Sequence, residues 1–284
     1  MHMPFKRKYS VPVWAMWLMS GCILVSTQTW GASEQAYSFS VVPQQSATKL
    51  ARTWVPLLQL LQQKTGIPLR FVTAPDIPTF ENRLARGEYD FAYMNPYHYT
   101  VFHQNSGYQA FAKQANKRIR GILVVRQDSE TQAVEDLEGQ VIAFPAPAAF
   151  AATLLVRSYL NNQGITYEPK FVSSHDSVYR AVSGEFTGAG GGIVRTLESV
   201  DPEVRAQLRI LWKSPGYTPH AFSAHPRVPA PVVEKLQQAL RELVNHPEGL
   251  DVLKNVNFGA IEPAVDNDWE DIRKLNIDAI KSVN

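Results

Sequence analysis

Short apolar stretches alternate with longer stretches of helical periodicity along the first part of the chain. Residues 37–43 alternate polar and apolar side chains and end at a proline, which is typical of a short strand. Residues 47–66 repeat leucine and tryptophan at helical spacing, and Gly66 is suited to end that helix. Further strands are expected at 69–74 and 91–94, and helices at 77–87 and after 95. This β-α-β-α-β-α order predicts a mostly parallel sheet.

The pattern then restarts as a second α/β unit. Its expected elements are, in chain order, a strand at 119–129, a turn and strand at 136–145, a helix at 148–165, a strand at 170–174, a helix at 175–186, a glycine-rich element at 188–194 and a strand at 208–214. Residues 220–226 predict a strand that returns to the first unit. Two helices are expected at the end, at 230–246 and 267–283.

The chain shows no internal repeat and no low-complexity linker between the two units. We therefore expect an α/β fold of two intimately joined lobes that are crossed by two hinge strands. The first lobe would comprise residues 33–122 plus 222–284, and the second lobe residues 123–221. Ligands of such folds bind outside the carboxyl ends of parallel strands, which here lie at the cleft between the lobes.

The first 32 residues differ from the rest of the chain. Lys6, Arg7 and Lys8 precede an apolar run at 11–26 and a short polar segment, the pattern of a secretory signal peptide. The run is shorter than the ~18–20 residues wanted for a spanning helix, although an uncleaved N-terminal anchor stays an alternative. Cys22, the only cysteine, ends "MSGC", which resembles a bacterial lipoprotein box. We therefore predict export to the periplasm, with anchoring through a lipidated Cys22 as an alternative to cleavage.

Charge and motifs exclude several classes of function. Removal of residues 1–32 would leave 25 basic and 26 acidic residues, and the densest basic patch is only 116–120, so nucleic-acid binding is not indicated. The seven histidines form neither an HExxH motif nor a Cys/His cluster, so no metal or other cofactor is expected. There is no GxSxG motif, and the Ser, His and Asp at 173–177 are sequence neighbours, unlike most triads. An exported α/β hydrolase is therefore only a remote alternative.

The candidate binding residues lie where helices begin. The stretch "FPAPAAFAATLL" (Phe144–Leu155) joins a strand to a helix, a geometry that points free N–H groups at an anion. Asn95 can cap a second helix, with Tyr93 and Tyr97 beside it as ligand contacts or packing residues. His175 begins a third helix and is either a ligand contact or a structural hydrogen-bonding group. The glycines at 188–192 allow either a close backbone approach or a bare cleft wall.

The order of these segments resembles the substrate-binding proteins of phosphate, phosphite and phosphonate ABC transporters. The resemblance covers nearly all of the chain after the predicted signal peptide. It is carried by "VVPQQSATKLARTWVPLLQLLQQKTG", "GEYDFAYMNPYHY", "DLEGQVIAFPAPAAFAATLL", "SSHDSVYRAVSGEF" and "SPGYTPHAFSAHPRVP". It implies a two-lobed periplasmic-binding-protein fold of the type with two hinge strands. It also implies that ligand capture closes the lobes and that a membrane partner recognises the closed form.

By position, the resemblance implies ligand contacts at Gln44, Gln45, Tyr93, the turn Ala149–Ala151 and His175. The side chains of the turn differ from the family pattern, because Ala149, Phe150 and Ala151 stand where relatives commonly carry a cluster of hydroxyl groups. Thr187 likewise stands where relatives often carry an aspartate. Other residues are therefore candidate replacements for the lost donors: Tyr179, Arg195, Tyr217 and His220.

The sequence thus predicts a non-catalytic, exported and monomeric protein that captures a small anion resembling phosphonate or phosphate for an ABC importer. The alternative is a ligand-sensing protein that binds a different small molecule and signals through a membrane receptor. The alanine and phenylalanine side chains of the turn keep this alternative open, because each lost hydroxyl bond to a charged oxygen would remove ~1.5–3 kcal/mol of binding free energy.

Overall fold

A computed structural model describes residues 36–277 of the chain. The predicted signal peptide, Cys22 and the end of the predicted last helix lie outside these residues. Within them, none of the helices is both long and apolar enough to cross a membrane.

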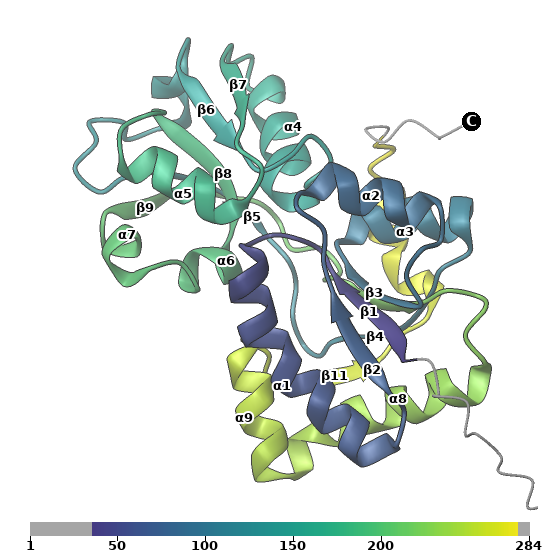
Figure 1. The fold of residues 1–284 in the computed structure, drawn as a ribbon. Coiled ribbons are helices and arrows are strands. Elements are labelled where there is room, and N and C mark those ends of the chain that lie inside the picture. Colours follow the sequence, from purple (N-terminus) through teal and green to yellow (C-terminus); the bar gives the residue numbers. More distant parts are fainter. Residues whose placement is uncertain (1–35, 278–284) are drawn as a thin grey trace, which may run out of the picture. The chain divides into compact units, whose positions relative to one another are not determined.

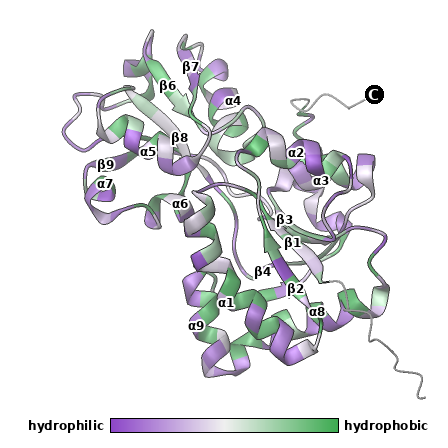
Figure 2. Cartoon of the chain, in the orientation of Figure 1, coloured by the Kyte–Doolittle hydropathy of each residue, from purple (hydrophilic) through white to green (hydrophobic). Residues whose placement is uncertain are grey.

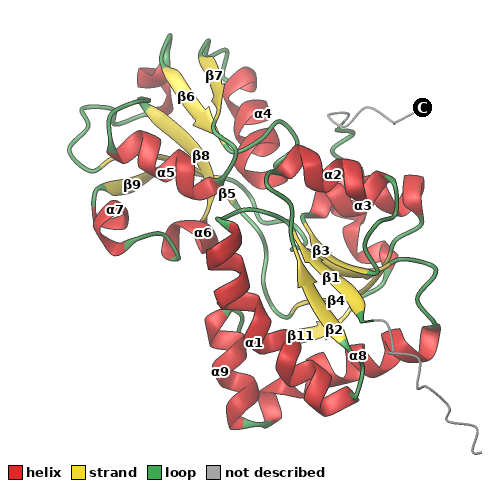
Figure 3. Ribbon diagram, in the orientation of Figure 1, coloured by secondary structure: helices red, strands yellow, loops and turns green. Residues whose placement is uncertain are grey.

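The described residues form two mixed sheets, each accompanied by helices (Figures 1 and 3). One sheet has six strands in the order β11-β4-β10-β3-β1-β2, and the other has five in the order β7-β6-β8-β5-β9. We call the part with the six-stranded sheet the first lobe and the part with the five-stranded sheet the second lobe. The strands are β1 (Tyr37–Val41), β2 (Leu69–Val72), β3 (Phe91–Met94), β4 (Gln109–Gln114), β5 (Gly121–Arg126), β6 (Val141–Phe144), β7 (Glu168–Phe171), β8 (Ala189–Ile193), β9 (Leu208–Lys213), β10 (Ala221–Ala224) and β11 (Ile261–Pro263).

The helices follow the predicted order, with additions. They are α1 (Ala47–Thr65), α2 (Ile77–Ala85), α3 (Pro96–Ser106), η1 (Val134–Leu137), η2 (Phe150–Leu154), α4 (Leu155–Asn162), α5 (His175–Ser183), α6 (Val194–Glu198), α7 (Pro202–Ala206), α8 (Ala230–Glu242), η3 (Leu243–Asn245), α9 (Pro247–Asn255), η4 (Asp266–Trp269) and α10 (Glu270–Arg273). The sequence analysis placed no helix at 247–255, and it predicted one continuous helix from 267 where η4, α10 and non-helical residues lie.

Strand directions are parallel only in part. In the first lobe, β1 is parallel to β2 and β3, as the β-α-β-α-β pattern predicted. However, β10 runs antiparallel to β3 and β4, and β11 runs antiparallel to β4. In the second lobe, β6 is parallel to β7 and β8, whereas β5 is antiparallel to β8 and β9. The pattern thus predicted the parallel strands β1, β2 and β3 correctly, and the antiparallel pairings of β4, β5, β9, β10 and β11 make both sheets mixed.

The chain passes between the lobes twice, after β4 and after β9. The two crossing segments, 115–120 and 214–220, are held together by an antiparallel bridge between Ile119 and Tyr217. Each of these residues donates its N–H to the carbonyl of the other, at 2.8 and 2.9 Å. The connection is thus a single bridge between extended segments and not a pair of long strands. The exact residue boundaries of the lobes stay a prediction.

The core of the first lobe confirms the periodicity that predicted α1. The apolar residues of that helix are buried against the sheet: Leu50, Trp54, Leu57, Leu58 and Leu61. Burial of each such side chain contributes about 1.5–3 kcal/mol to folding. Helices α1, α8 and α9 carry both apolar and polar stretches in Figure 2, as expected of helices that bury one face and expose the other.

The glycine-rich segment forms β8, in the middle of the second sheet. A Cβ added at Gly191 would overlap the carbonyl oxygen of Ala152 and lie 2.8 Å from the Phe144 ring. A Cβ at Gly121, on the neighbouring strand β5, would overlap the carbonyl oxygen of Ala151. The glycines therefore allow η2 to lie directly on the backbone of the sheet. This observation supports the close-approach interpretation of the glycine run.

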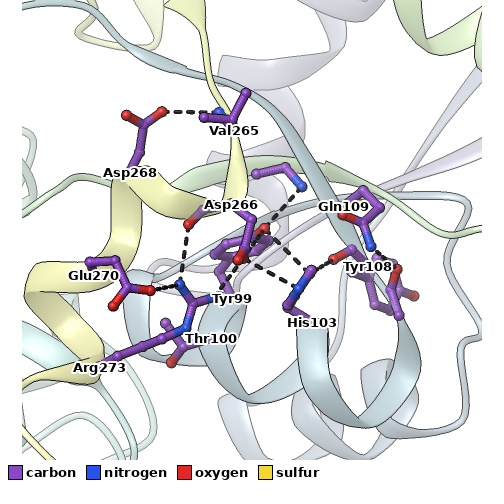
Figure 4. Close-up of polar contacts among 12 residues, drawn as sticks. Tyr99, Thr100, His103, Tyr108, Gln109, Val265, Asp266, Asp268, Glu270 and Arg273 are labelled. Carbon is purple, nitrogen blue, oxygen red and sulfur yellow. Dashed lines mark hydrogen bonds and ion pairs between the residues drawn. The ribbon is translucent and has the colours of Figure 1, made fainter.

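The last described segment is fixed to α3 by a polar cluster (Figure 4). The Tyr99 hydroxyl donates to Asp266 Oδ1 at 2.8 Å, and His103 Nε2 lies 3.4 Å from the same oxygen. Arg273 donates to Asp266 Oδ1 at 2.5 Å and to Glu270 at 2.7 Å. These contacts hold η4 and α10 against α3. They lie within one lobe.

Candidate ligand-binding cleft

The helix start at Ala149–Ala152 lies at the centre of the candidate site. After β6 the chain turns through Pro145 and Pro147 and enters one π-helical turn, η2, before α4 begins. Thr153 Oγ1 donates to the carbonyl of Ala146 at 2.7 Å and closes this turn. The first N–H groups of a helix have no intrahelical acceptor, and they carry the positive end of its dipole. π-helical turns are rare and are frequently found at functional sites.

A small cavity of about 10 Å³ lies against this helix start. Such a volume is close to the minimum that one water molecule needs. Its lining comes from both lobes: Val42, Gln44, Ile77, Asn95, Ile119, Ala149, Phe150, Ala151, Ala152, His175, Ile193 and His220. The lining contains no aspartate or glutamate. The polar groups that face the cavity are therefore amides, imidazoles and backbone groups, which suits an anion better than a cation.

His175 enters the cavity from the second lobe as the first residue of α5. Ser174 caps that helix by accepting from the N–H of Ser177 at 3.1 Å, which presents His175 at the turn. Its backbone N–H donates to the carbonyl of Gln44 in the first lobe at 3.0 Å, and its Nδ1 lies 3.2 Å from Thr196 Oγ1. Burial lowers the pKa of His175 to about 3, and the nearby Arg195 charge acts in the same direction. His175 is thus a neutral imidazole that joins the two lobes.

His220 enters from the crossing segment before β10. Its ring stacks on Tyr93 with centroids 5.0 Å apart, and its Nε2 lies 3.2 Å from the Gln44 side-chain amide nitrogen. Burial holds the pKa of His220 well below its usual value, with a smaller contribution from Arg195. Burial also raises the pKa of Tyr93 to about 12. At neutral pH this part of the site is uncharged and contributes hydrogen bonds only.

Arg195 supplies the positive charge of the site. It projects from α6 and donates to Gln44 Oε1 across the cleft. Gln44 thereby contacts three groups of the site, namely Arg195, His175 and His220. A second contact between the lobes is the ion pair of Lys49 and Asp176, at 3.4 Å. Half-exposed pairs of this kind contribute about 0–1 kcal/mol, so the buried contacts of Gln44 are the more specific ones.

Asn95 caps α3 as predicted, with Pro96 at the first helical position. Its Oδ1 accepts from the N–H of His98 at 2.8 Å, and its Nδ2 donates to the carbonyl of Ala148 in the second lobe at 3.3 Å. One side chain therefore both begins a helix and reaches the turn on which η2 starts.

Several predicted residues do not line the small cavity. Tyr93 stacks on His220 without lining the cavity, and Tyr97 is buried in an apolar cluster that includes residues of both lobes. Gln45 is buried, and its side-chain nitrogen has no partner among the described residues. Tyr217 lies on a crossing segment and packs edge-on against Phe150, with centroids 5.6 Å apart. Tyr179 is used inside the second lobe, where its hydroxyl contacts Ile193 and Thr196.

Sequence reasoning missed two features of the cleft. The apolar wall of the small cavity comes from residues with no polar signal: Val42, Ile77, Ile119, Ala152 and Ile193. Next to it lies a larger pocket of about 400 Å³ that contains several basic side chains. The run 116–120 was the available signal for this pocket. Among residues 36–277 no group of three or more His, Cys, Asp or Glu side chains is arranged to hold a metal ion.

The comparisons with known proteins agree with this geometry. A family model described as the periplasmic substrate-binding protein of phosphonate ABC transporters matches residues 39–269. The chain belongs to this family. The phosphonate-binding family consists of substrate-binding transport proteins, so the predicted resemblance and the predicted class of periplasmic binding protein are confirmed.

The individual relatives of this chain are distant in sequence. It is 20% identical over 282 residues to the phosphate-import protein PhnD of Mycolicibacterium smegmatis, with 85% of each chain covered. It is similar to the solved binding protein of an ABC phosphonate transporter from Pseudomonas aeruginosa, with a TM-score of 0.79, 18% identity and 86% of each chain covered. The PhnD1 structure from Prochlorococcus marinus in complex with methylphosphonate gives a TM-score of 0.78 and 15% identity, covering 86% of this chain and 99% of that one. These likenesses confirm the two-lobed periplasmic-binding-protein fold.

Proposed function

We propose that this chain is an exported, monomeric solute-binding protein that captures a small phosphonate-like or phosphate-like anion between its lobes for an ABC permease. The observation that carries the proposal is the small cavity. It combines a helix start, two buried imidazoles and the Asn95 amide, with Arg195 one side chain away, and its lining has no carboxylate. The distant relatives add support, since one is named a phosphate-import protein and another was solved with methylphosphonate.

The anion would be held mainly by the backbone N–H groups of residues 150–152. The neutral imidazoles of His175 and His220 can each donate one further hydrogen bond. A hydrogen bond to a charged oxygen contributes about 1.5–3 kcal/mol, so the absence of side-chain hydroxyls at Ala149 and Ala151 weakens the site by orders of magnitude in affinity. We therefore propose weaker capture than in relatives that carry a hydroxyl cluster.

Capture would require the lobes to separate and close again. A cavity of about 10 Å³ has room for one water molecule and not for an oxyanion. The contacts between the lobes that would have to break include the hydrogen bonds that Gln44 accepts from His175 and Arg195. They also include the bond from Asn95 Nδ2 to Ala148 and the Lys49–Asp176 ion pair. A ligand that binds only when both lobes contact it shifts the protein towards the closed form, which the permease would recognise.

A second candidate function is ligand sensing through a membrane receptor. Phe150 favours it, because this residue is 1% exposed and fills the place where a hydroxyl clamp would stand in relatives. A planar or apolar group on the ligand would then replace part of the anionic contact. The same cleft would serve, with a different solute.

A thermal-shift panel tests these proposals directly. It would contain phosphate, phosphite, methylphosphonate, sulfonates and small organic acids. A true ligand at a concentration of ~100 Kd stabilises the folded protein by about 2.7 kcal/mol. We expect a shift with at least one phosphorus oxyanion. No shift from any of them would refute anion capture for an importer, and a shift from an organic acid alone would favour the sensing function.

We also propose that residues 1–32 direct export, either by cleavage after them or by lipidation of Cys22. Mass spectrometry of the protein recovered from the periplasm and from membranes separates the two routes, because lipidation adds acyl chains to a chain that begins at Cys22.

A further inference from the structure

The larger pocket lies beside the small cavity and shares the wall formed by Ile119, Ile193 and His220 with it. Its volume of about 400 Å³ falls within the range of sites for whole small molecules, which is ~300–1,000 Å³. We call it the crossing-segment pocket, because both crossing segments contribute to its lining. Residues of the two lobes complete it, among them Gln114 and Asn257 from the first lobe and Val194 from the second.

The lining of the crossing-segment pocket is strongly basic. It includes five cationic side chains and one carboxylate: Lys117, Arg118, Arg120, Arg195 and Lys213, with Glu198. Three of the cations lie on one crossing segment, one ends β9 and one belongs to α6. These elements are far apart in the sequence, and the tertiary fold brings their charged side chains to one pocket.

Most of this positive charge is not neutralised inside the protein. Arg118 pairs with Asp271 at 2.6 Å, whereas Arg120 donates only to the carbonyl of Ser214. Lys117 and Lys213 have no hydrogen-bond or ion-pair partner within residues 36–277. Like charges gathered around one pocket repel one another and attract an ion of opposite charge.

The lining combines exposed cationic side chains with an apolar part. Ile119, Ile193 and Pro219 form its inner wall, and the Tyr93 ring also borders it. Apolar walls with several convergent charged groups are the usual composition of a small-molecule site. One phosphate group contacts only a few donors at once, so five cations spread over three parts of the chain suit several linked phosphate groups better.

We propose that the crossing-segment pocket binds a polyphosphate compound, with a chain of two or three phosphate groups lying among Lys117, Arg120 and Lys213. This site adjoins the anion site at the start of η2 and shares part of its wall, but these three cations line the crossing-segment pocket alone. The same chemistry is presented by free tripolyphosphate and by nucleoside triphosphates.

The test measures binding of tripolyphosphate to the purified full chain by isothermal titration calorimetry, at low and high salt. We expect binding that weakens as salt screens the charges. The double substitution K117E/K213E should weaken binding at least tenfold. The matched control K170E/K235E changes the net charge equally at exposed lysines outside both pockets and should weaken binding by less than threefold. Circular dichroism melts of both variants establish that they are folded.

Equal weakening in the two variants would overturn the proposal, since it would mean that only net charge matters. The proposal would also fail if inorganic phosphate or sulfate displaced tripolyphosphate at the same concentrations, because a single oxyanion would then suffice. Equal affinity for tripolyphosphate and a nucleoside triphosphate would mean that the phosphate chain alone is recognised. Tighter binding of the nucleotide would indicate that its base also contacts the apolar wall.

Discussion

Two buried imidazoles define the site at the scale of single residues. His175 comes from the second lobe and His220 from the segment that precedes β10, and both line the same small cavity. Burial keeps both side chains neutral, and the Arg195 guanidinium reinforces this. A neutral imidazole can donate with one nitrogen and accept with the other, so each ring can serve the protein and a ligand at once.

The stability of the protein should fall as the solution is acidified from pH 7 to pH 5. The pKa of His175 is about 3 in the folded protein and about 6.5 in an unfolded chain, so the unfolded state binds more protons in this range. The stabilisation is present above pH 6.5 and is lost progressively as the pH falls towards 3. His175 alone should account for about 2 kcal/mol of loss by pH 5. Urea unfolding at each pH measures this slope.

The variant H175N isolates this contribution, because it removes the titrating group and keeps a polar side chain near Thr196. Its stability should change less between pH 7 and pH 5 than that of the unsubstituted protein. H246N is the matched control, since His246 is exposed at the start of α9, and it should keep the original slope. An unchanged slope in H175N would contradict the assignment.

Restoring hydroxyls at the helix start should strengthen anion binding. Ala149 and Ala151 line the small cavity, and a serine at either place can add a hydrogen bond to a charged oxygen, worth about 1.5–3 kcal/mol or at least tenfold in affinity. The double variant A149S/A151S should therefore bind methylphosphonate at least tenfold more tightly in calorimetry. A148S is the control, because Ala148 is buried but does not line the cavity. Equal affinities in the two variants would argue against an anion at this turn.

At the scale of elements, the contact between β8 and η2 sets the position of the helix start. Gly191 and Gly121 let the carbonyl groups of Ala152 and Ala151 rest on the sheet without intervening side chains. The turn is therefore placed by its close contact with the backbone of the second lobe, together with the hydrogen bond from Thr153 Oγ1 to Ala146. This arrangement explains how a turn made of alanine and phenylalanine can keep the geometry of an anion site.

Substitution of Gly191 by alanine should therefore be costly. The new methyl group would meet backbone and the Phe144 ring, neither of which can move easily, and overpacking of this kind costs about 1–3 kcal/mol of unfolding free energy. G259A is the control, since a Cβ at Gly259 meets nothing within 4 Å, and it should change stability by less than about 0.5 kcal/mol. Chemical denaturation measures both. Similar stabilities in the two variants would mean that η2 can shift away from the sheet.

Elements with strong local signals could be predicted from the sequence. Helix α1 was found because its leucines repeat at helical spacing, and α3 because Asn95 and Pro96 mark its start. Strands β4 (QAFAKQ) and β11 (IEP) were missed, because neither segment has the run of β-branched residues or the regular alternation that marks a strand. Helix α9 was missed because it is short and buries only Gly249, Val252 and Leu253, which is too few for a clear helical pattern.

The candidate site was predictable to the same degree. His175 and the turn at 149–151 sit at helix starts, where sequence and geometry are linked, and they do line the small cavity. Tyr97 and Tyr217 were chosen for their chemistry alone, and packing places them elsewhere. The crossing-segment pocket could not be predicted, because Lys117 and Lys213 are far apart in the sequence and line one pocket only in the folded protein.

At the scale of the whole molecule, two crossing segments carry the only covalent connections between the lobes within residues 36–277. The bridge between Ile119 and Tyr217 joins these segments at one point, so bending there can change the opening of the cleft without disturbing either sheet. Hinges of this type absorb domain closure in a few residues outside the regular elements.

Ligand binding should therefore make the protein more compact in solution. Small-angle X-ray scattering with and without a saturating ligand from the thermal-shift panel should show a smaller radius of gyration in the bound form, because a ligand held by both lobes favours closure. The forward scattering also gives the mass and tests the monomer. A radius of gyration that stays the same at saturation would argue against closure of the cleft.

The contacts of Gln44 have a consequence for which solutes can be selected. Its side-chain and backbone carbonyl oxygens accept from the Arg195 guanidinium and from the N–H of His175, so these two donors already have an acceptor within the protein. A neutral solute with one acceptor would exchange one such bond for another and gain little. A doubly charged oxyanion would gain more from the same exchange, since bonds to charged acceptors are about twice as strong. Gln44 thus competes with the ligand for these donors and favours solutes that carry a negative charge.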